Sequence, residues 1–464
     1  MSFSVSIRKH RFGIFFWGLV LIRAFFNAAL PLMDKTEARY GEIARLMAET
    51  GNWVVLQIDY FIPFWAKPPL STWASASSIW LFGTHEFFVR LPYLLVLIGL
   101  GLWLSRYRSS TQHSIYLPGI IVLTLPEMYL HGGVVSTDMF LTLSVCLVML
   151  SFWEALQEKA HTFWGYLFFI GMGFGLLAKG PIIGILTVPP LFLWLLLTKN
   201  FKTSLFRLPW ISGTMLCLLV SVPWYVWTEL RSPGFVDYFI IGEHFNRYFN
   251  SAWTGDKYGF PKQQPFGIVW AFLLAAILPW TVLLIKLMIQ KFRSIRQNPW
   301  LLYLVFWMFW PAVFFTTSKS LIHPYVLPSM VPVALFLVHY WDQVKRKKTY
   351  LSIALSLPLL LLLVYTSGMV ATVFDDNSDK KLVQVVAIDE PLYALEKKTY
   401  SSQFYSQGKI KVLPLDTFII ATQKPSGFSI LATHKDWMKI PDSIQKQFRL
   451  LGKNKKRGIY QRIE

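Results

Sequence analysis

The sequence predicts a polytopic α-helical membrane protein with a small α/β domain at its C-terminal end. Three observations predict this fold class. Hydrophobic residues make up 54% of the chain and charged residues only 15%, whereas soluble domains usually hold about 25% charged residues. The mean hydropathy is +0.44. Apolar runs long enough to cross a bilayer recur between Phe12 and Val373, and the segment after Phe374 is charged instead.

Eleven apolar segments are candidate membrane spans. The first follows a basic stretch, Arg8 to Arg11, and lacks a small-residue cleavage site, so we interpret it as a retained signal anchor. Cys146 and Cys217 both lie in apolar spans, so neither a disulfide framework nor a cysteine metal site is expected. The candidate spans are 12–30, 88–105, 115–131, 138–156, 163–178, 181–198, 209–228, 266–289, 300–317, 324–341 and 350–373.

The distribution of basic residues predicts the orientation. If the N-terminus is cytoplasmic, the cytoplasmic connections carry basic clusters such as 286–296 and 345–348. The short connections on the other side then carry only Lys179 and Lys319. This asymmetry is the positive-inside bias, and the odd number of spans places the C-terminal segment outside. The net charge of +20 therefore reflects membrane topology, and no nucleic-acid partner is expected.

Two long loops and a tail are predicted on the outer side. The loops cover residues 31–87 and 229–265, within a transmembrane catalytic domain of residues 1–374. Residues 375–464 are predicted to form a small extracytoplasmic, periplasmic α/β domain. Its predicted elements are a helix at 388–398 and strands at 411–421 and 429–433.

The first outer loop begins with an amphipathic pattern over residues 34–50. Apolar and charged side chains fall on separate faces at helical spacing, and the segment is too polar to span, so we expect a helix at the membrane interface. Asp34 followed by Glu37 fits a capping box, in which Asp34 accepts a backbone N–H. A second oxygen of Asp34 would remain for substrate or metal.

Lys67 follows Trp65 and Ala66 and precedes two prolines. A residue before proline is held extended, which would present the ammonium group in a fixed direction. A lysine is a compact point charge suited to phosphate. The alternative interpretation is a lysine that reaches along apolar surface toward water. Within the membrane, Arg23 and Glu127 are expected to face an internal cavity, as a pair in one hypothesis.

Several short motifs, taken in order, resemble one family. They are the segment 30–44, Trp65-Ala66-Lys67-Pro68-Pro69-Leu70, the segment 87–92, Ser136-Thr137-Asp138, the segment 177–181, Pro223-Trp224-Tyr225, the segment 243–248, and the segment 318–328. The chain resembles GT-C glycosyltransferases of the protein O-mannosyltransferase superfamily, in the bacterial branch that includes lipid A aminoarabinose transferases. The resemblance implies about eleven to thirteen transmembrane helices in the bacterial inner membrane.

The resemblance also implies a reaction. Such enzymes move a sugar, with inversion, from a polyprenyl (undecaprenyl) phosphate donor to an acceptor at the outer face, here lipid A or a related lipid or glycan. The leaving lipid phosphate needs cations to stabilise its charge. The implied donor-phosphate residues are Lys67, Lys179 and Arg247; the implied catalytic residues are Asp34, Glu37 and Asp138; further substrate-cavity residues are Lys319, His323 and Tyr325.

One position departs from the family pattern. Ala66 stands where the family usually has an acidic residue that is thought to help hold a metal. A divalent metal ion would then need its ligands from elsewhere, with His244 as the implied metal residue. The other possible ligands are Asp34, Glu37 and Asp138.

Alternatives remain open for the acceptor and for the class. A hydroxyl acceptor needs a general base, for which Asp34 is the best-placed carboxylate, whereas a phosphate acceptor needs none. One alternative is an enzyme like the protein O-mannosyltransferases, acting on Ser or Thr. Another is a polyprenyl-diphosphate-dependent polymerase or ligase. A secondary transporter usually shows paired repeats and polar groups near the midplane, whereas here the ionisable residues gather at the outer ends of spans.

Overall fold

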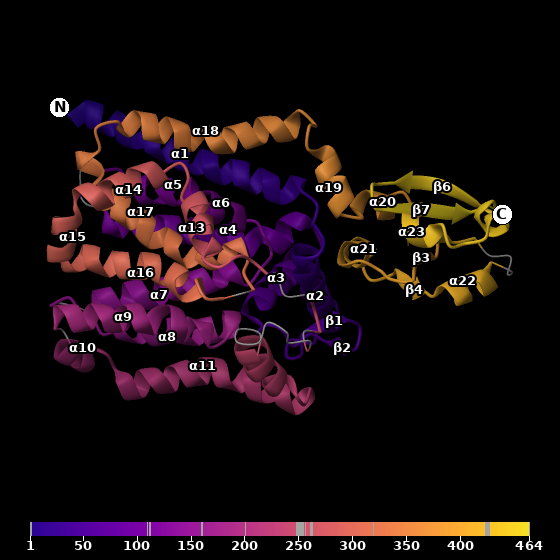
Figure 1. Cartoon of the computed structure of the whole chain (residues 1–464), viewed down its shortest axis with the longest axis horizontal. Coiled ribbons are helices and arrows are strands. Elements are labelled where there is room, and N and C mark those ends of the chain that lie inside the picture. Colours follow the sequence, from indigo (N-terminus) through magenta and orange to yellow (C-terminus); the bar gives the residue numbers. More distant parts are fainter. Residues whose placement is uncertain are drawn as a thin grey trace.

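Most of the chain forms helices that lie side by side in one bundle, with the C-terminal sheet beyond one end of it (Figure 1). The N-terminus lies at the opposite end of the bundle from the sheet. The computed structural model describes residues 2–108, 110, 113–158, 161–199, 201–246, 255, 257–259, 263–318, 320–422 and 427–463.

Within these residues, five helices are long and apolar enough to cross a membrane, or six if one bent pair counts as a single span. The five are α1 (Ser2–Ala29), α4 (Glu86–Trp103), α7 (Asp138–Ala155), α11 (Trp210–Arg231) and α18 (Lys347–Thr366). Shorter apolar helices complete the bundle, namely α8 (Phe163–Lys179), α9 (Ile182–Thr198), α16 (Pro299–Phe315) and η3 (His323–Ser329) continuing into α17 (Met330–His339).

Two predicted spans are broken helices, and a proline lies at each break. Proline has no N–H to donate, and its ring clashes with the carbonyl of the preceding turn, so a helix tends to end before it. Pro126 and Pro279 occupy these positions. The broken spans are 115–131, which forms α5 (Leu117–Leu123) and α6 (Pro126–His131), and 266–289, which forms α13 (Ile268–Ala276) and α14 (Thr281–Gln290), bent by 103°.

The predicted interfacial helix exists as α2 (Thr36–Thr50), but most of it is buried rather than lying on a surface. It packs against α3 (Leu70–Phe82) and against α21 (Tyr400–Tyr405) of the C-terminal domain. Its charged face can be covered because Arg45 donates two hydrogen bonds of 2.7 Å to Glu42 and also pairs with Glu49. Ion pairs within the helix satisfy charges that would otherwise be costly to bury.

The C-terminal domain contains a five-stranded sheet in the order β4-β3-β5-β7-β6. β3 pairs in parallel with β4 and β5, whereas β7 pairs antiparallel with β5 and β6. Its small core includes Phe418, Phe428 and Ile430. The strands are β3 (Leu392–Leu395), β4 (Lys411–Leu413), β5 (Ser429–Thr433), β6 (Phe448–Lys453) and β7 (Arg457–Arg462).

The expected strand at 429–433 is confirmed as β5, but two other predictions in the tail are wrong. The expected helix at 388–398 contains strand β3 instead. A short apolar run cannot be assigned to helix or strand by periodicity, and a strand inside a parallel sheet lacks alternation. The expected strand at 411–421 ends at Leu413, and the helix α22 (Leu415–Ala421) follows Pro414.

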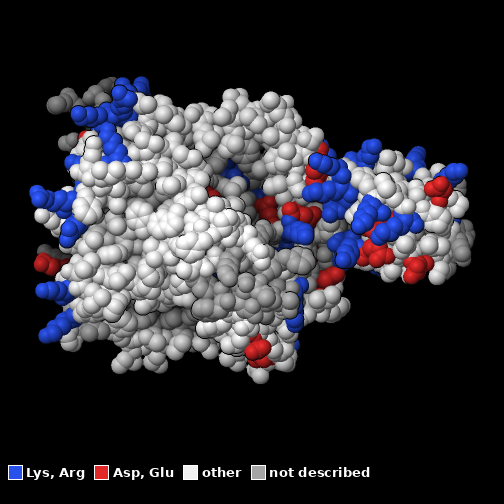
Figure 2. Space-filling view, in the orientation of Figure 1, with Lys and Arg blue, Asp and Glu red and all other residues white. Residues whose placement is uncertain are grey.

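Charged residues gather at the two ends of the molecule. Figure 2 shows Lys and Arg at the end of the bundle away from the sheet, an almost uncharged middle, and both signs of charge around the C-terminal domain. Where the bundle meets that domain, this face is hollowed, and both acidic and basic side chains are visible in the hollow. An apolar belt between charged ends is the surface expected of a membrane-spanning bundle.

The remaining elements are short and lie in the loops of the bundle or in the C-terminal domain. The β1–β2 hairpin lies in the first loop, and η2 is a π-helical stretch in the second. They are β1 (Gln57–Asp59), β2 (Ile62–Pro63), η1 (Leu104–Tyr107), α10 (Phe201–Arg207), η2 (Asp237–Asn246), α15 (Phe292–Gln297), η4 (Trp341–Gln343), α19 (Ala371–Asn377), α20 (Lys380–Gln384), α23 (His434–Trp437) and α24 (Asp442–Gln445).

Candidate active site

Lys179 and Asp138 form a buried ion pair between two neighbouring helices. Lys179 is the last residue of α8, and Asp138 is the first residue of α7. Because the two helices pack closely, the end of one meets the start of the other. The ammonium group donates to the Asp138 carboxylate, and both side chains are mostly buried. The N-cap residue of α7 is Thr137, which makes no side-chain cap hydrogen bond, and Asp138 follows it with its carboxylate bound to Lys179.

Tyr325 joins the same cluster. The ammonium nitrogen of Lys179 lies 4.6 Å from the centroid of the Tyr325 ring. A cation over an aromatic face is attracted to the electron-rich ring. The ring also packs against Phe315 at 4.6 Å between centroids, which fixes its position. The predicted substrate-cavity residue Tyr325 is therefore brought to the predicted phosphate residue Lys179.

His323 contacts an acidic residue of α6. Its Nδ1 lies 2.7 Å from Glu127 Oε1, and the same oxygen lies 3.2 Å from His131 Nδ1. The His323 side chain is 54% exposed, whereas Glu127 is buried. The hypothesis of an Arg23–Glu127 pair is wrong. Arg23 instead donates to Asn27 at 2.9 Å, while the Glu127 carboxylate lies beside His323 and His131.

Lys67 forms the second buried ion pair. Its ammonium group donates to Glu243 Oε2 at 2.9 Å and to the carbonyl oxygen of Ala66 at 2.6 Å. The exposed fractions of the Lys67 and Glu243 side chains are 17% and 2%. Glu243 lies in η2 of the second loop, 176 residues away in sequence. Sequence reasoning missed this partner; the one signal was its place beside His244 in the motif segment.

His244 links the second loop to the backbone of α8. Its Nδ1 lies 2.7 Å from the carbonyl oxygen of Phe239, and its Nε2 lies 3.2 Å from the carbonyl oxygen of Lys179. Burial lowers the pKa of His244, and the positive charge of Lys67 lowers it further. Consecutive residues, Glu243 and His244, therefore contact both lysine-bearing segments.

Asp34 lies against the C-terminal domain. Its carboxylate accepts hydrogen bonds from the backbone N–H of Ser401, at 3.0 Å, and from the Ser401 hydroxyl. The predicted capping box is wrong, since α2 begins at Thr36 and its N-cap residue, Lys35, makes no side-chain cap. The carboxylate turns toward α21 instead, where two donors satisfy it. Burial raises the pKa of Asp34 above its ordinary value of 3.8.

Glu37 has a different partner. Its carboxylate accepts two hydrogen bonds from Arg90, at 2.8 and 2.9 Å. Arg90 also donates to the carbonyl oxygens of Asn27, Leu30 and Pro31. A buried, two-point arginine–carboxylate pair is strong and directional. Arg90 of α4 thus ties the end of α1 to α2, which carries Glu37. Two predicted residues, Arg247 and Lys319, lie outside the described residues.

The described part of the chain does not fit a divalent metal ion. It contains no group of three or more His, Cys, Asp or Glu side chains placed to hold one. Both ring nitrogens of His244 face backbone carbonyls, and Ala66 offers no side-chain ligand. The carboxylate of Glu243 is engaged by Lys67.

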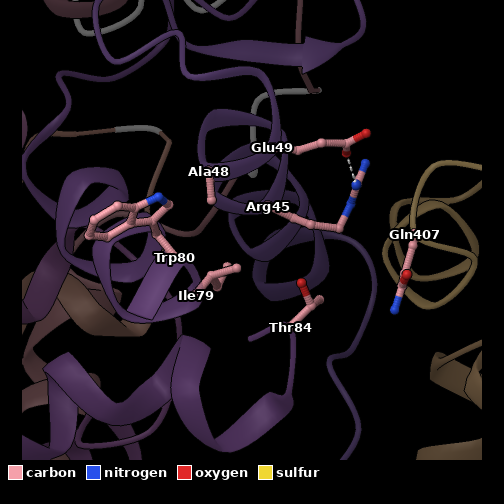
Figure 3. A pocket seen from close by; sticks show the side chains of 7 residues that line it. All are labelled: Arg45, Ala48, Glu49, Ile79, Trp80, Thr84 and Gln407. Carbon is pink, nitrogen blue, oxygen red and sulfur yellow. Dashed lines mark hydrogen bonds and ion pairs between the residues drawn. The ribbon is translucent and has the colours of Figure 1, made fainter. Parts of the chain in front are cut away.

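A separate groove of about 380 Å³ lies between α2, the end of α3 and the C-terminal domain. Figure 3 shows the Arg45–Glu49 pair in the middle, Trp80 on one side and Gln407 of the C-terminal domain on the other. None of the predicted catalytic or phosphate-binding residues that the structure describes lines it. The lining residues are Arg45, Ala48, Glu49, Ile79, Trp80, Thr84 and Gln407.

Comparisons with known proteins identify relatives of this chain. The chain is 30% identical over 318 residues to the undecaprenyl phosphate-alpha-4-amino-4-deoxy-L-arabinose arabinosyl transferase of Erwinia tasmaniensis, covering 67% of this chain and 55% of that protein. The transferase of the same description from an Enterobacter species is 30% identical over 330 residues, covering 67% and 56%. The chain thus spans little more than half the length of these curated relatives.

Similarity to solved structures shows the fold. The crystal structure of ArnT from Cupriavidus metallidurans bound to undecaprenyl phosphate superposes with a TM-score of 0.77 at 18% identity, covering 97% of each chain. Its apo state gives a TM-score of 0.76 at 17% identity, with the same coverage. The family model described as dolichyl-phosphate-mannose-protein mannosyltransferase matches residues 6–239, half of the chain. The chain therefore belongs to the dolichyl-phosphate-mannose-protein mannosyltransferase family and has the GT-C fold of its bacterial members.

Proposed function

We propose that the protein transfers a sugar from an undecaprenyl-phosphate carrier to lipid A or a related lipid or glycan, at the outer face of the bacterial inner membrane. The similarity to undecaprenyl phosphate-alpha-4-amino-4-deoxy-L-arabinose arabinosyl transferases supports the donor class. One observation in this chain carries the proposal. Two mostly buried lysines, Lys67 and Lys179, each hold a buried carboxylate and are joined through consecutive residues of one loop.

The lysines suit the charge that develops on the donor. When the bond between the anomeric carbon and the phosphate oxygen breaks, its electron pair stays on the lipid phosphate. Ammonium groups in a poorly solvated site interact with this charge more strongly than they would in water. Glu243 and Asp138 hold Lys67 and Lys179 in place before the donor arrives. The donor phosphate would lie between the two ammonium groups.

The acceptor determines whether a base is needed. A phosphate oxygen of the acceptor is already anionic and can attack the anomeric carbon directly. Asp34, expected as a base, is held by Ser401 in this structure. The His323–Glu127 hydrogen bond favours a second candidate, transfer to a hydroxyl group of a glycan or of a protein Ser or Thr. In that case His323, oriented by Glu127, would take the proton of the attacking hydroxyl.

Orientation belongs to the same proposal. The basic connections between spans support a cytoplasmic N-terminus and a periplasmic C-terminal domain. The carrier lipid would then reach the lysines from the outer leaflet. Secondary transport finds no support in membership of a glycosyltransferase family.

Mass spectrometry of lipid extracts tests the proposal. A deletion strain is complemented with wild type, Lys67→Met or Lys179→Met, and with Lys439→Met as a control that removes an exposed lysine–aspartate pair. We expect a polyprenyl-phosphate sugar to accumulate and one lipid A glycoform to disappear with the first two variants only. If the polyprenyl-phosphate sugar accumulates while lipid A is unchanged, the acceptor is a protein or another glycan. Unchanged lipid pools in the deletion strain itself would contradict the proposal.

A further inference from the structure

The two outer loops meet around Lys67. The backbone N–H of Trp65 donates to the Tyr258 hydroxyl at 3.1 Å, and the Trp65 indole donates to Ser232 at 2.8 Å. The ammonium group of Lys257 lies 4.1 Å from the centroid of the Trp65 ring. The second loop thus encloses the residues that precede Lys67, and it reaches Lys67 itself through Glu243.

Glu243 occupies the innermost position of this enclosure. Its side chain is 2% exposed, and it accepts from the Tyr238 hydroxyl at 3.4 Å as well as from Lys67. A lysine side chain has four flexible carbons, so a charged partner is needed to define where its ammonium group lies. A buried carboxylate is itself costly unless it is paired. The pair therefore fixes both groups.

The adjacent residue ties this pair to the second lysine. His244 Nε2 lies 3.2 Å from the carbonyl oxygen of Lys179, and its ring packs edge-on against Phe239 at 4.7 Å. Glu243, which pairs with Lys67, immediately precedes His244, which contacts the end of α8. The position of Lys67 is therefore linked to that of α8. The charges of the two lysines and their two carboxylates, Glu243 and Asp138, cancel, so both cations can stay buried before an anion binds.

We propose that Glu243 is a positioning residue for the sugar transfer. It holds the ammonium group of Lys67 at a set separation from that of Lys179, so that both can contact one lipid phosphate. Ala66 has no carboxylate, and the second loop supplies one from Glu243, 176 residues after Lys67. This inference rests on the proposed function, and it assigns Glu243 a role that acts through Lys67.

A double-mutant cycle with undecaprenyl phosphate itself as the probe tests the inference. Binding is measured on the purified full-length protein by intrinsic tryptophan fluorescence. We expect Glu243→Ala to raise the Kd about tenfold, because an unheld lysine must be ordered by the ligand. In the Lys67→Met background the same substitution should change the Kd less than about twofold, since its effect passes through Lys67. Glu243→Gln, which keeps an acceptor oxygen, should lie between wild type and Glu243→Ala.

A matched control lies at the end of α11, where the second loop begins. Glu229 accepts from the backbone N–H groups of Gly234 and Val236, both at 2.8 Å, and contacts neither lysine in any described interaction. Glu229→Gln should leave the Kd within about twofold of wild type. Equal losses in the wild-type and Lys67→Met backgrounds would make Glu243 merely structural and overturn the inference. Tighter binding by Glu243→Ala would mean that Glu243 competes with the phosphate for Lys67, and would also overturn the inference.

The same experiment separates the two levels of the proposal. If wild-type protein does not bind undecaprenyl phosphate, the proposed donor fails. If wild type binds and Lys67→Met weakens binding while Glu243→Ala does not, the donor stands and the positioning role fails. Should Glu243→Ala lower the thermal unfolding temperature, Glu243→Gln provides the comparison at preserved fold.

Discussion

The carboxylate of Asp34 in the first loop accepts hydrogen bonds from both the backbone N–H and the hydroxyl of Ser401 in the C-terminal domain, 367 residues later. Further bonds run in parallel. Lys398 and Gln403 donate to Asp59, and Lys380 pairs with Glu86. In these side-chain contacts the first loop supplies acceptors and the C-terminal domain supplies donors, whereas the backbone N–H groups of Leu32 and Asp34 donate to the Tyr405 hydroxyl and to the carbonyl oxygen of Asn377. The carboxylate expected to serve catalysis takes part in attaching the domain.

Ser401→Ala should weaken this attachment. The backbone N–H remains, so one of the two hydrogen bonds to Asp34 is lost. We expect a loss of about 1–2 kcal/mol in the free energy of unfolding, as for a buried hydrogen bond that leaves its acceptor underused. Thermal unfolding in detergent measures it. Ser443→Ala, at an exposed position of the same domain, is the control, and equal shifts for both variants would refute the contact.

Asp34→Asn should change how stability depends on pH. Burial raises the pKa of Asp34, so the folded state binds this proton more tightly than the unfolded state does. The contribution of Asp34 to stability therefore falls as pH rises from about 4 through the raised pKa. Asparagine cannot ionise. The unfolding temperature of Asp34→Asn relative to that of wild type should rise as the pH is raised from 4 to 7.5. If the difference between the two unfolding temperatures is constant over this range, the raised pKa is contradicted.

Lys179→Met should separate stability from activity. It leaves the buried Asp138 carboxylate without its cation, which costs about 3–5 kcal/mol when one partner of a buried pair is removed. Lys179→Met combined with Asp138→Asn should recover most of the unfolding temperature. Sugar transfer should stay lost in both, since the phosphate cation is absent. Recovery of transfer in the double variant would remove Lys179 from the chemistry.

Chelation should leave sugar transfer unchanged. In the described part of the chain, the site carboxylates and His244 already contact lysine, arginine, serine, histidine or backbone groups. No three or more such side chains there are placed to hold a metal ion. Membranes treated with EDTA and washed should keep their transfer rate within about twofold. A loss restored by one added divalent ion would show that the site rearranges around a metal. Ala66→Glu, which adds a carboxylate beside Lys67, tests whether a metal requirement can be introduced.

Cysteine labelling tests the orientation. Both native cysteines are buried, so they should react little. Met438→Cys, 79% exposed in the C-terminal domain, should react with a membrane-impermeant maleimide in cells with a permeable outer membrane. Arg346→Cys, in a basic connection, should react only after the inner membrane is opened. The reverse pattern would invert the proposed topology.

Much of the fold followed from local sequence. The apolar runs located the spans because burial in lipid depends on the length and composition of one continuous segment. The positions of Lys179 and Asp138 at helix ends followed in the same way, since they stand where apolar runs stop and start. Strand β5 was predicted at its observed bounds, Ser429–Thr433.

Contacts between distant segments were decided only by the tertiary structure. The pairing of Lys67 with Glu243, of Asp34 with Ser401 and of Glu127 with His323 joins residues at least 176 positions apart. A charged residue in a region expected to be buried predicts that a partner exists, but the sequence does not identify that partner. Strand β3 at Leu392–Leu395 is a related case, because its neighbours β4 and β5 make it a strand. Hydrogen bonds and ion pairs depend on distances between atoms, and packing sets these distances after the local elements have formed.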